Sequence, residues 1–450
     1  MPSRVEPERI RVLREGPPRT GRYVLYWMQS SQRTEDNPAL RYAVERADRA
    51  NLPLVVFFGL DGSYPESSLR HLQFMAEGLA DIARTLEERG IFFALQPVYP
   101  AEGACRLAAD ASLVVVDRGY LRPQQEMYRS AAEHCPCPLV QVEGNVVVPV
   151  ETASQKEEYA AATIRPKIER LLDRFLHRTA AGAPRHSSRS LDLPTLAGEP
   201  AGTLLSHVAM DRSVPASPIL TGGSAEAERR FADFLDHRLD GFAENRNDPG
   251  GDGGSGMSPY LHFGQVSPVT LALRAREHGG PGVPAFLEEL IVRRELAVNF
   301  VRYNPRYDTF ASLPSWAQAT LEKHQGDQRE YVYTPAELEG AATHDPSWNA
   351  AQQEMVTTGR MQGYMRMYWG KKILEWSPSP LEAYATAISL NNRYEIDGRD
   401  PNGYAGVAWC FGKHDRPWKE REIFGTVRYM NAAGLERKFA MDRYLSRFPG

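Results

Sequence analysis

The chain of 450 residues is predicted to fold as an α/β domain with a doubly wound parallel sheet, followed by an all-α domain. Three observations predict this. Short apolar runs alternate with amphipathic stretches up to about residue 150, a stretch of connector composition follows, and long helical patterns without strand-like runs fill the remainder. The length also exceeds what one simple core supports. We therefore predict an α/β domain at 1–150, a connector at 151–224 and a helical domain at 225–450.

Five apolar runs are predicted as the strands of the first domain: 23–27, 52–58, 91–96, 112–117 and 138–142. Helical patterns at 37–51 and 68–90 separate the first three runs. This alternation is typical of βαβ units in a parallel sheet. Nucleotide-like ligands bind such sheets beyond the carboxyl ends of the strands, but no G-x-G-x-x-G follows the first strand. A dinucleotide site in this domain is therefore only weakly indicated.

The connector and the second domain differ sharply in composition. Residues 179–224 are rich in Pro, Ser, Gly and Ala, which is the composition of linkers and turns. From Ala225 onward, patterns such as AEAERRFADFLDHRL and VPAFLEELIVRRELAVNFVRY place apolar residues at helical spacing. The second domain is therefore predicted to be mostly helical.

Composition and charge exclude few functions. The apolar fraction of 42% and the charged fraction of 24% are those of an ordinary soluble globular protein. A net charge of -4 argues against a uniformly basic nucleic-acid binder, although binding depends on where the charge lies. From Phe411 to the end there are nine Lys and Arg against five Asp and Glu. This excess is either a local basic patch or an ordinary solvated face.

The cysteines and the chain start indicate a cytoplasmic protein. Cys105, Cys135, Cys137 and Cys410 show no disulfide framework, which fits a reducing compartment. The run from His134 to Cys137 lacks the second ligand pair of a structural zinc site, so no metal is predicted. The charged N-terminal stretch is no signal peptide, and no run of about 18 apolar residues predicts a membrane span.

Three of the seven tryptophans, Trp348, Trp369 and Trp376, lie in the predicted helical stretch THDPSWNAAQQEMVTTGRMQGYMRMYWGKKILEW. On one helix Trp369 and Trp376 would share a face, about 10 Å apart by rise. This spacing suggests an electron-transfer path. The alternative is that the indoles are ordinary buried core residues.

Four further motifs carry a resemblance to a known family. They are YVLYWMQSSQR from Tyr23, RNDPGGDGGSGMSPYLHFGQVSP from Arg246, EELIVRRELAVNF from Glu288 and LNNRYEIDGRDPNGYAGVAWCFGKHDRPWKEREIFG from Leu390. Together they resemble DNA photolyases of the cryptochrome/photolyase superfamily, and the class II cyclobutane pyrimidine dimer photolyases in particular. The resemblance covers nearly the whole chain.

The resemblance implies a light-driven lyase that repairs cyclobutane pyrimidine dimers. Electron transfer from reduced anionic FAD to a flipped-out dimer would split it into two pyrimidines, because no side chain is a strong enough reductant. The alternative function is that of a cryptochrome-like flavin photoreceptor without repair activity. A third possible class is a nucleotide-binding protein without photochemistry. The first domain would hold an antenna pigment, a deazaflavin or a folate, if any. The resemblance also suggests a monomer that needs no protein partner.

The resemblance assigns the flavin site to two segments. Gly254, Ser255, Gly256, Met257 and Ser258 form a turn whose small residues let the backbone approach a pyrophosphate. The family more often has bulkier residues at positions 254 and 256. The second segment holds an ion pair and an amide beside the flavin ring, which favour its anionic reduced form; its residues are Arg366, Asn391, Asp397, Gly398 and Arg399. A plain salt bridge between helix and loop is the alternative for Arg366 and Asp397.

The resemblance also assigns the lesion pocket. Glu289 would contact the dimer carbonyls as charge develops on them, unless it is only an i,i+4 partner of Arg293. Trp409 would stack on the dimer with Met367 close by, and Val292 stands where related proteins have a second aromatic wall. Stacking is worth about 1–3 kcal/mol per base, which is comparable with the cost of extruding a nucleotide.

Cations around this pocket are assigned to DNA, where they would neutralise phosphates. They are Arg293, Lys413, Arg416 and Arg428. Trp348, Trp369 and Trp376 are assigned to a chain that photoreduces oxidised flavin from the surface inward.

Overall fold

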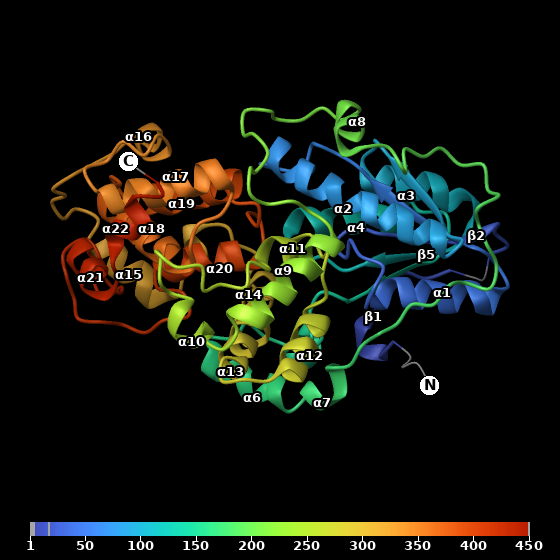
Figure 1. Cartoon of the computed structure of the whole chain (residues 1–450), viewed down its shortest axis with the longest axis horizontal. Coiled ribbons are helices and arrows are strands. Elements are labelled where there is room, and N and C mark those ends of the chain that lie inside the picture. The colour runs from blue at the N-terminus through green and yellow to red at the C-terminus, as the bar shows by residue number, and fades with distance from the viewer. Residues whose placement is uncertain (1–4, 17–18, 449–450) are drawn as a thin grey trace.

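The computed structural model describes residues 5–16 and 19–448 and separates the α/β domain from the helical domain. In Figure 1 the α/β domain lies at the right and the helical domain at the left, with the two chain ends on opposite sides. The strands are β1 Ile10–Arg14, β2 Tyr23–Trp27, β3 Leu54–Gly59, β4 Phe92–Gln96, β5 Ala111–Asp117 and β6 Leu139–Val142. They form one sheet in the order β1-β6-β5-β2-β3-β4.

The sheet confirms the five predicted strands and adds one. Strand β2 pairs parallel with β3 and β5, whereas β1 pairs antiparallel with β6. Sequence analysis missed β1, whose residues IRVLR carry two arginines and remain partly or fully exposed. An edge strand pairs with a neighbouring strand on one side only. Charged side chains on such a strand discourage pairing with the strands of other chains.

Helices cover both faces of the sheet, as the doubly wound prediction requires. They are α1 Pro38–Ala50, α2 Leu69–Glu88, α3 Pro100–Leu107 and α4 Arg122–His134. Alternate residues of β2 enter different cores: Val24 and Tyr26 pack with α1 and α2, and Leu25 and Trp27 pack with α3 and α4. The sequence determines the ends of α1, because Asn37 caps its first turn and Asn51 adopts the left-handed conformation after the last.

The connector is partly helical. It contains α5 Val150–Ala153, α6 Ala161–Glu169, α7 Leu172–Phe175 and α8 Ala201–Ser206. Ile164 and Ile168 are buried in the main core, so the first part of the connector packs as structure. Residues 179–200 form neither helix nor strand. They cross the α/β domain, where the Leu196 amide donates to the Leu95 carbonyl at 2.8 Å.

The helical domain extends from α9 to α22 and contains no β-strand within the described ranges. Its helices are α9 Ser224–His237, α10 Phe242–Asn245, α11 Ser258–His262, α12 Pro268–His278, α13 Val283–Leu287, α14 Arg294–Tyr303, α15 Ser315–Lys323, α16 Pro335–Glu339, α17 Pro346–Thr358, α18 Gly363–Trp376, α19 Pro380–Tyr394, α20 Pro401–Cys410, α21 Ala432–Lys438 and α22 Met441–Leu445. A π-helical segment, Glu288–Arg293, joins α13 to α14. In the described part of the chain, no helix is long and apolar enough to span a membrane.

Helix α2 joins the two domains. The buried Arg70 guanidinium donates to the carbonyls of Met355, Val356 and Tyr394 at 2.6–3.1 Å. The next residue, His71, is 2.9 Å from the Glu395 carbonyl, and burial lowers its pKa. The loop that follows α19 is therefore held against the α/β domain.

The tryptophan-bearing stretch is two helices, and the prediction of a single helical stretch was wrong. Gly359 ends α17 with φ 77°, and the Gln362 side chain caps α18 by accepting from the amides of Tyr364 and Met365. A glycine in the left-handed conformation costs little and commonly terminates a helix. Trp348 therefore lies on a different helix from Trp369 and Trp376.

Candidate active site

A cavity of about 840 Å³ opens in the helical domain. Its lining joins predicted cofactor, lesion and electron-transfer residues, among them Gly254, Ser258, Arg366, Asn391, Trp369, Glu289, Met367 and Trp409. A second cavity of about 260 Å³ shares Ser258 and Glu289 with it and is lined by Ser255 and Met257 as well. Together they have the size of a site for a cofactor-sized ligand.

Glycines let a flat ligand approach the backbone in this cavity. Gly403 and Gly406 of α20 line it, and a Cβ at Gly406 would meet no protein atom within 4 Å. The same is true of Gly256, which has φ 70°, a conformation that glycine adopts at little cost. At both glycines a ligand could therefore approach the backbone closely.

Arg366 is held between two carboxylates at the cavity. Its Nη2 lies 2.9 Å from Asp397 Oδ1 and 2.8 Å from Glu395 Oε2. Burial opposes the charged guanidinium, but the two carboxylates outweigh burial and raise the pKa of Arg366. The Ser258 hydroxyl donates to the other Asp397 oxygen. The two predicted cofactor segments therefore meet at one network.

Sequence reasoning missed Glu395, which belongs to the same network. Its side chain is 1% exposed, and burial raises its pKa well above the ordinary range. It precedes Asp397 by two residues, and both carboxylates contact the same Arg366 nitrogen. In a loop, the sequence has no helical or strand periodicity that would show whether a glutamate such as Glu395 is buried or exposed to solvent.

The loop after α19 positions Asn391 and constrains Gly398. The buried Asn391 lines the cavity, and its Nδ2 donates to Asn392 Oδ1 at 3.3 Å. A Cβ at Gly398 would lie 2.7 Å from the Asn391 carbonyl oxygen and 2.8 Å from that of Glu395. Gly398 therefore permits the tight loop, rather than lining either of the two cavities.

Arg399 was predicted with the cofactor residues, but its side chain lines a different cavity. Its guanidinium lies 5.6 Å from the Tyr64 ring centroid, in a cavity of about 310 Å³. Its backbone adopts the left-handed conformation, with φ 63°. Only its amide remains in the loop network, donating to Asn392 Oδ1 at 3.0 Å.

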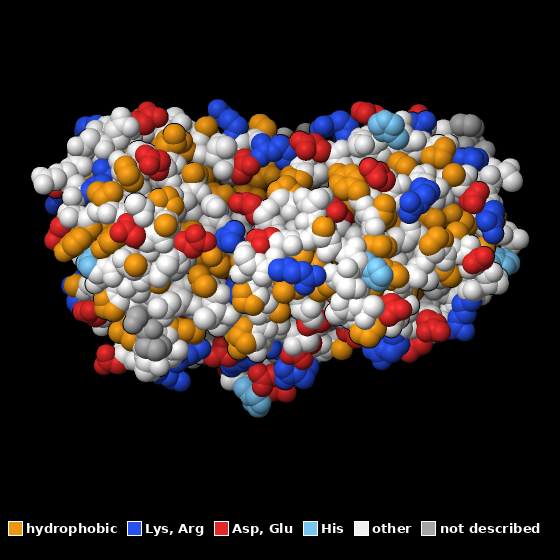
Figure 2. Space-filling view, turned by 90° about the horizontal axis from the view of Figure 1, so that it is seen from above, with side chains coloured by type: hydrophobic (Ala, Val, Ile, Leu, Met, Phe, Trp, Pro, Cys, Tyr) orange, Lys and Arg blue, Asp and Glu red, His pale blue; other side chains and the backbone are white. Residues whose placement is uncertain are grey.

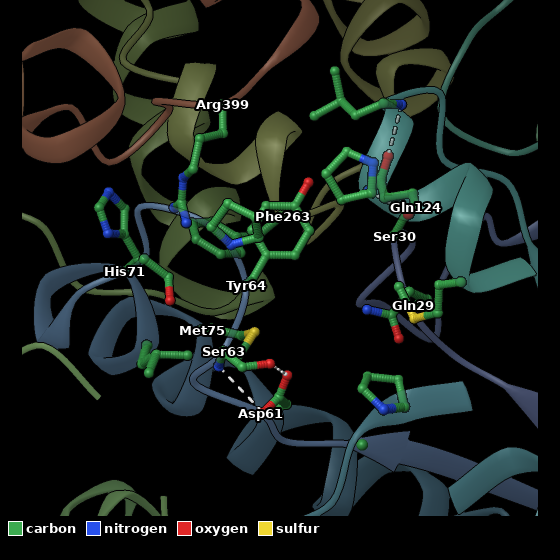
Figure 3. A pocket seen from close by; sticks show the side chains of 18 of the residues that line it. Gln29, Ser30, Asp61, Ser63, Tyr64, His71, Met75, Gln124, Phe263 and Arg399 are labelled. Atoms are coloured by element: carbon green, nitrogen blue, oxygen red, sulfur yellow. Dashed lines mark hydrogen bonds between the residues drawn. The ribbon is translucent and has the colours of Figure 1, made fainter. Parts of the chain in front are cut away.

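The 310 Å³ cavity lies beyond the carboxyl ends of the strands, where doubly wound sheets bind ligands. Figure 3 shows Gln29 and Ser30 on one side of it and Arg399, Tyr64 and His71 on the other. The segment after β2 is fixed by Asp117, whose carboxylate accepts from the amides of Gln29, Ser30 and Ser31. His262, Phe263 and Arg399 of the helical domain also line this cavity, so both domains contribute to its walls.

The three tryptophans form a connected series. Trp369 lines the large cavity, and its indole N–H donates to Gln352 Oε1 at 2.8 Å. The Trp348 indole donates to the Trp369 carbonyl at 3.0 Å, and the Trp348 and Trp376 ring centroids lie 5.7 Å apart. The order inward is Trp376, Trp348, Trp369, so a residue of α17 lies between two residues of α18.

Trp376 is itself buried, and other aromatic residues continue toward the surface. Its ring centroid lies 5.5 Å from Tyr333 and 5.1 Å from His344. Tyr331, which is 39% exposed, stacks on His344 at 3.7 Å. Sequence analysis did not select these residues, because the segment that carries Tyr331 and Tyr333 has no regular pattern.

Glu289 faces the large cavity and pairs with Arg246, whose Nη1 lies 2.8 Å from Glu289 Oε1. The alternative pairing of Glu289 with Arg293 is wrong. The segment is π-helical, so residues five apart face each other, and Arg293 pairs with Glu288 at 3.1 Å. The π-turn frees Glu289 from its helical neighbour and directs it into the cavity. Arg293 lines the same cavity.

Trp409 is flanked by two cations. Lys371 Nζ lies 5.4 Å and the Arg428 guanidinium carbon 5.6 Å from its ring. Lys371 is fully buried and donates to the Cys410 carbonyl at 2.5 Å. Burial lowers its pKa to about 8. Sequence reasoning missed Lys371, because a lysine in a helix is usually on the surface.

Lys413, predicted to neutralise DNA phosphates, lies inside the protein. It is 7% exposed, pairs with Glu157 and donates to the Ser312 carbonyl at 2.9 Å. Its ammonium is therefore not presented to a DNA backbone, and the prediction is corrected. Arg416 is exposed, and Arg428 lies between the rings of Trp409 and Trp418. Figure 2 shows basic and acidic side chains interspersed over the face that it draws.

No cluster of three potential metal-ligating side chains occurs among residues 5–16 and 19–448.

Comparison with known proteins identifies related chains. A family model described as DNA photolyase matches residues 24–185. A deoxyribodipyrimidine photo-lyase of Methanothermobacter thermautotrophicus is 53% identical over 450 residues and covers 99% of both chains. The protein of that name from Oryza sativa subsp. japonica is 42% identical and covers 97% of this chain and 90% of its own. A class III photolyase structure from Agrobacterium tumefaciens shares the fold, with a TM-score of 0.72 at 19% identity over 96% of this chain and 87% of its own.

Proposed function

This chain belongs to the DNA photolyase family, and from that premise we propose that it uses light to split cyclobutane pyrimidine dimers in DNA. The reaction is electron transfer from reduced anionic FAD to a flipped-out dimer. FAD, when bound, supplies the light-absorbing group and the single electron. One observation carries the proposal. A single cavity of about 840 Å³ brings together the Arg366–Asp397 pair, Asn391, Trp369, Glu289 and Trp409.

Of the residues that line these cavities, one group would bind the cofactor and another would bind the lesion. Ser255, Met257 and Ser258, with the glycines beside them, would bind the pyrophosphate end. Arg366, paired with Asp397, and Asn391 would lie along the flavin ring, where a fixed cation favours its anionic form.

At the other end of the cavity, Glu289 would hydrogen-bond the dimer carbonyls and Trp409 would stack on the bases. Arg293, Arg416 and Arg428 would contact phosphates. We further propose that the chain is a class II enzyme, because its motifs resemble those of that class. A cryptochrome-like photoreceptor is the alternative, and light-dependent loss of dimers from damaged DNA separates the two.

The 310 Å³ cavity would hold the antenna pigment, a deazaflavin or a folate. Support comes from its place beyond the strand ends and from Arg399 and Tyr64, whose charged and aromatic groups suit a flat polar chromophore. Extraction of pigment from protein purified from its native cells identifies the compound. Recovery of FAD alone would contradict this assignment.

Arg366→Met is expected to weaken flavin retention by about 10- to 100-fold, because charged hydrogen bonds are worth about 1.5–3 kcal/mol. The variant also leaves the buried Asp397 and Glu395 carboxylates without their cation. Flavin released per protein after dialysis measures the effect. Arg393→Met, which removes a half-exposed pair with Glu339, serves as the matched control. Full flavin content in Arg366→Met would contradict the assignment.

Dimer splitting by pre-reduced protein is expected to fall about threefold between pH 7 and pH 9 as Lys371 loses its proton. The cation lies behind Trp409, the ring proposed to stack on the dimer, so it favours the negative charge that the dimer receives. The pKa of Lys371 is lowered to about 8, so the charge is present below pH 8 and absent above it. Cys410, Asp415 and Arg428 are the other titratable or charged groups that act on it.

Two variants check this pH profile. Lys371→Arg keeps its charge and should give a flat profile, whereas Lys372→Met should keep the wild-type profile, since Lys372 is paired with Glu375 at 2.6 Å. The measurement is dimers split per absorbed photon on saturating DNA. An unchanged pH dependence in Lys371→Arg would show that another group titrates.

A further inference from the structure

Two cysteines on one side of the α/β domain lie in contact, although 30 residues separate them. Cys105 Sγ on α3 is 2.8 Å from Cys135 Sγ, which follows the last residue of α4. All four cysteines are free. A disulfide has an S–S bond of about 2.05 Å, so the two sulfur atoms need to approach by less than roughly 1 Å to form one.

The two thiols are chemically unequal. The hydrogen bond from Cys135, with His134 and Arg14 nearby, lowers the pKa of Cys105, which is partly exposed. The same contact, together with burial, raises the pKa of Cys135. A thiolate is the nucleophile in thiol oxidation, and redox-active cysteines are typically exposed beside a second, resolving thiol. Cys105, with its lowered pKa and partial exposure, matches the attacking thiol, and the buried Cys135 matches the resolving thiol.

We propose that Cys105 and Cys135 are a reversible oxidation site, in which a hydroperoxide converts the two thiols to one disulfide. The Cys105 thiolate attacks the peroxide O–O bond, forms a sulfenic acid and releases hydroxide or alkoxide. The Cys135 thiol then attacks the Cys105 sulfur, the S–S bond forms and water leaves. Two thiols are oxidised by two electrons, and the peroxide is reduced.

The bond would join two helices that begin at the 310 Å³ cavity. Tyr99 and Pro100, where α3 starts, line that cavity, and so do Pro123 and Gln124 in the first turn of α4. The helices pack on each other on the same face of the sheet, within one core. The disulfide therefore fixes the relative position of two helices that carry part of the cavity wall. The site depends on these contacts and not on the proposed repair activity.

Thiol counting on the full-length protein tests the proposal. Treatment of the folded protein with hydrogen peroxide should reduce the thiols titrated after unfolding from four to two, with loss of two hydrogens in the intact mass. Proteolysis should yield one linked pair of peptides, containing Cys105 and Cys135, and dithiothreitol should restore all four thiols. Four remaining thiols, a Cys135–Cys137 link or a link only between two chains would overturn the proposal.

Three variants distinguish the site from general oxidation. Cys135→Ser should leave a Cys105 sulfenic acid that dimedone traps, with no disulfide. Cys137→Ser and Cys410→Ser should each form the linked pair, and their thiol counts should fall from three to one. If Cys137→Ser abolishes the link while its circular dichroism matches the wild type, the assignment of the resolving thiol is wrong. Fragmentation of the linked wild-type peptides between Cys135 and Pro136 assigns the bond to Cys135 or to Cys137, even if Cys135→Ser does not fold.

Discussion

Trp369→Phe is expected to slow light-driven reduction of the oxidised flavin by about 100-fold or more, a change of roughly 2.7 kcal/mol or more in the barrier. Of the three tryptophans in the series, Trp369 lines the large cavity. Its indole N–H donates to the side-chain amide oxygen Oε1 of Gln352, which stabilises positive charge on the ring. Phenylalanine is harder to oxidise and cannot make that bond. Illumination with an external thiol reductant, followed by flavin absorbance, measures the rate.

The same variant should repair dimers at the wild-type rate within about twofold once its flavin is reduced chemically, because the role proposed for the series is only to restore the reduced cofactor. Trp418→Phe is the matched control, since Trp418 is 41% exposed and stands outside the series. Equal losses in photoreduction and in repair would mean that Trp369 shapes the site and does not carry the electron.

Glu289→Ala is expected to lower dimer splitting per absorbed photon by about tenfold or more, while the dark dissociation constant for damaged DNA changes less than about threefold. A group placed where charge develops contributes mainly to the reacting state. The π-helical turn directs Glu289 into the cavity, where Arg246 holds it at 2.8 Å. Photon-normalised splitting and dark binding, measured on one oligonucleotide, separate the two effects.

Glu288→Gln is the matched control for Glu289. It lies in the same turn and pairs with Arg165 and Arg293, so it reports any general loss of charge or helix structure. The control should retain the wild-type splitting yield. A Glu289→Ala variant that binds damaged DNA weakly but splits every bound dimer would contradict a role in the chemistry.

Much of the architecture could be predicted because burial imposes regular patterns. The four interior strands and the edge strand β4 are apolar runs, so these five were located from sequence. Strand β1 was missed because an edge strand can carry arginines. The break between α17 and α18 depends on the conformation of Gly359, and a single glycine is common inside helical patterns.

The site was harder to predict wherever a side chain's direction depends on local backbone geometry. Glu289, in a π-turn, pairs with Arg246 in place of Arg293, and Arg399, which has a positive φ, lines the other cavity. Lys371 and Lys413 resemble surface lysines in sequence, but packing buries both. Motif position located the segments of the site, whereas these details required three-dimensional contacts.

Dimer content of ultraviolet-damaged DNA, followed in the light and in the dark with flavin-loaded and chemically reduced protein, tests the central claim most directly. The account predicts that dimers disappear only in the light and that each yields two intact pyrimidines. Equal dimer content in light and dark, in protein that retains its flavin and binds the damaged DNA, would contradict it.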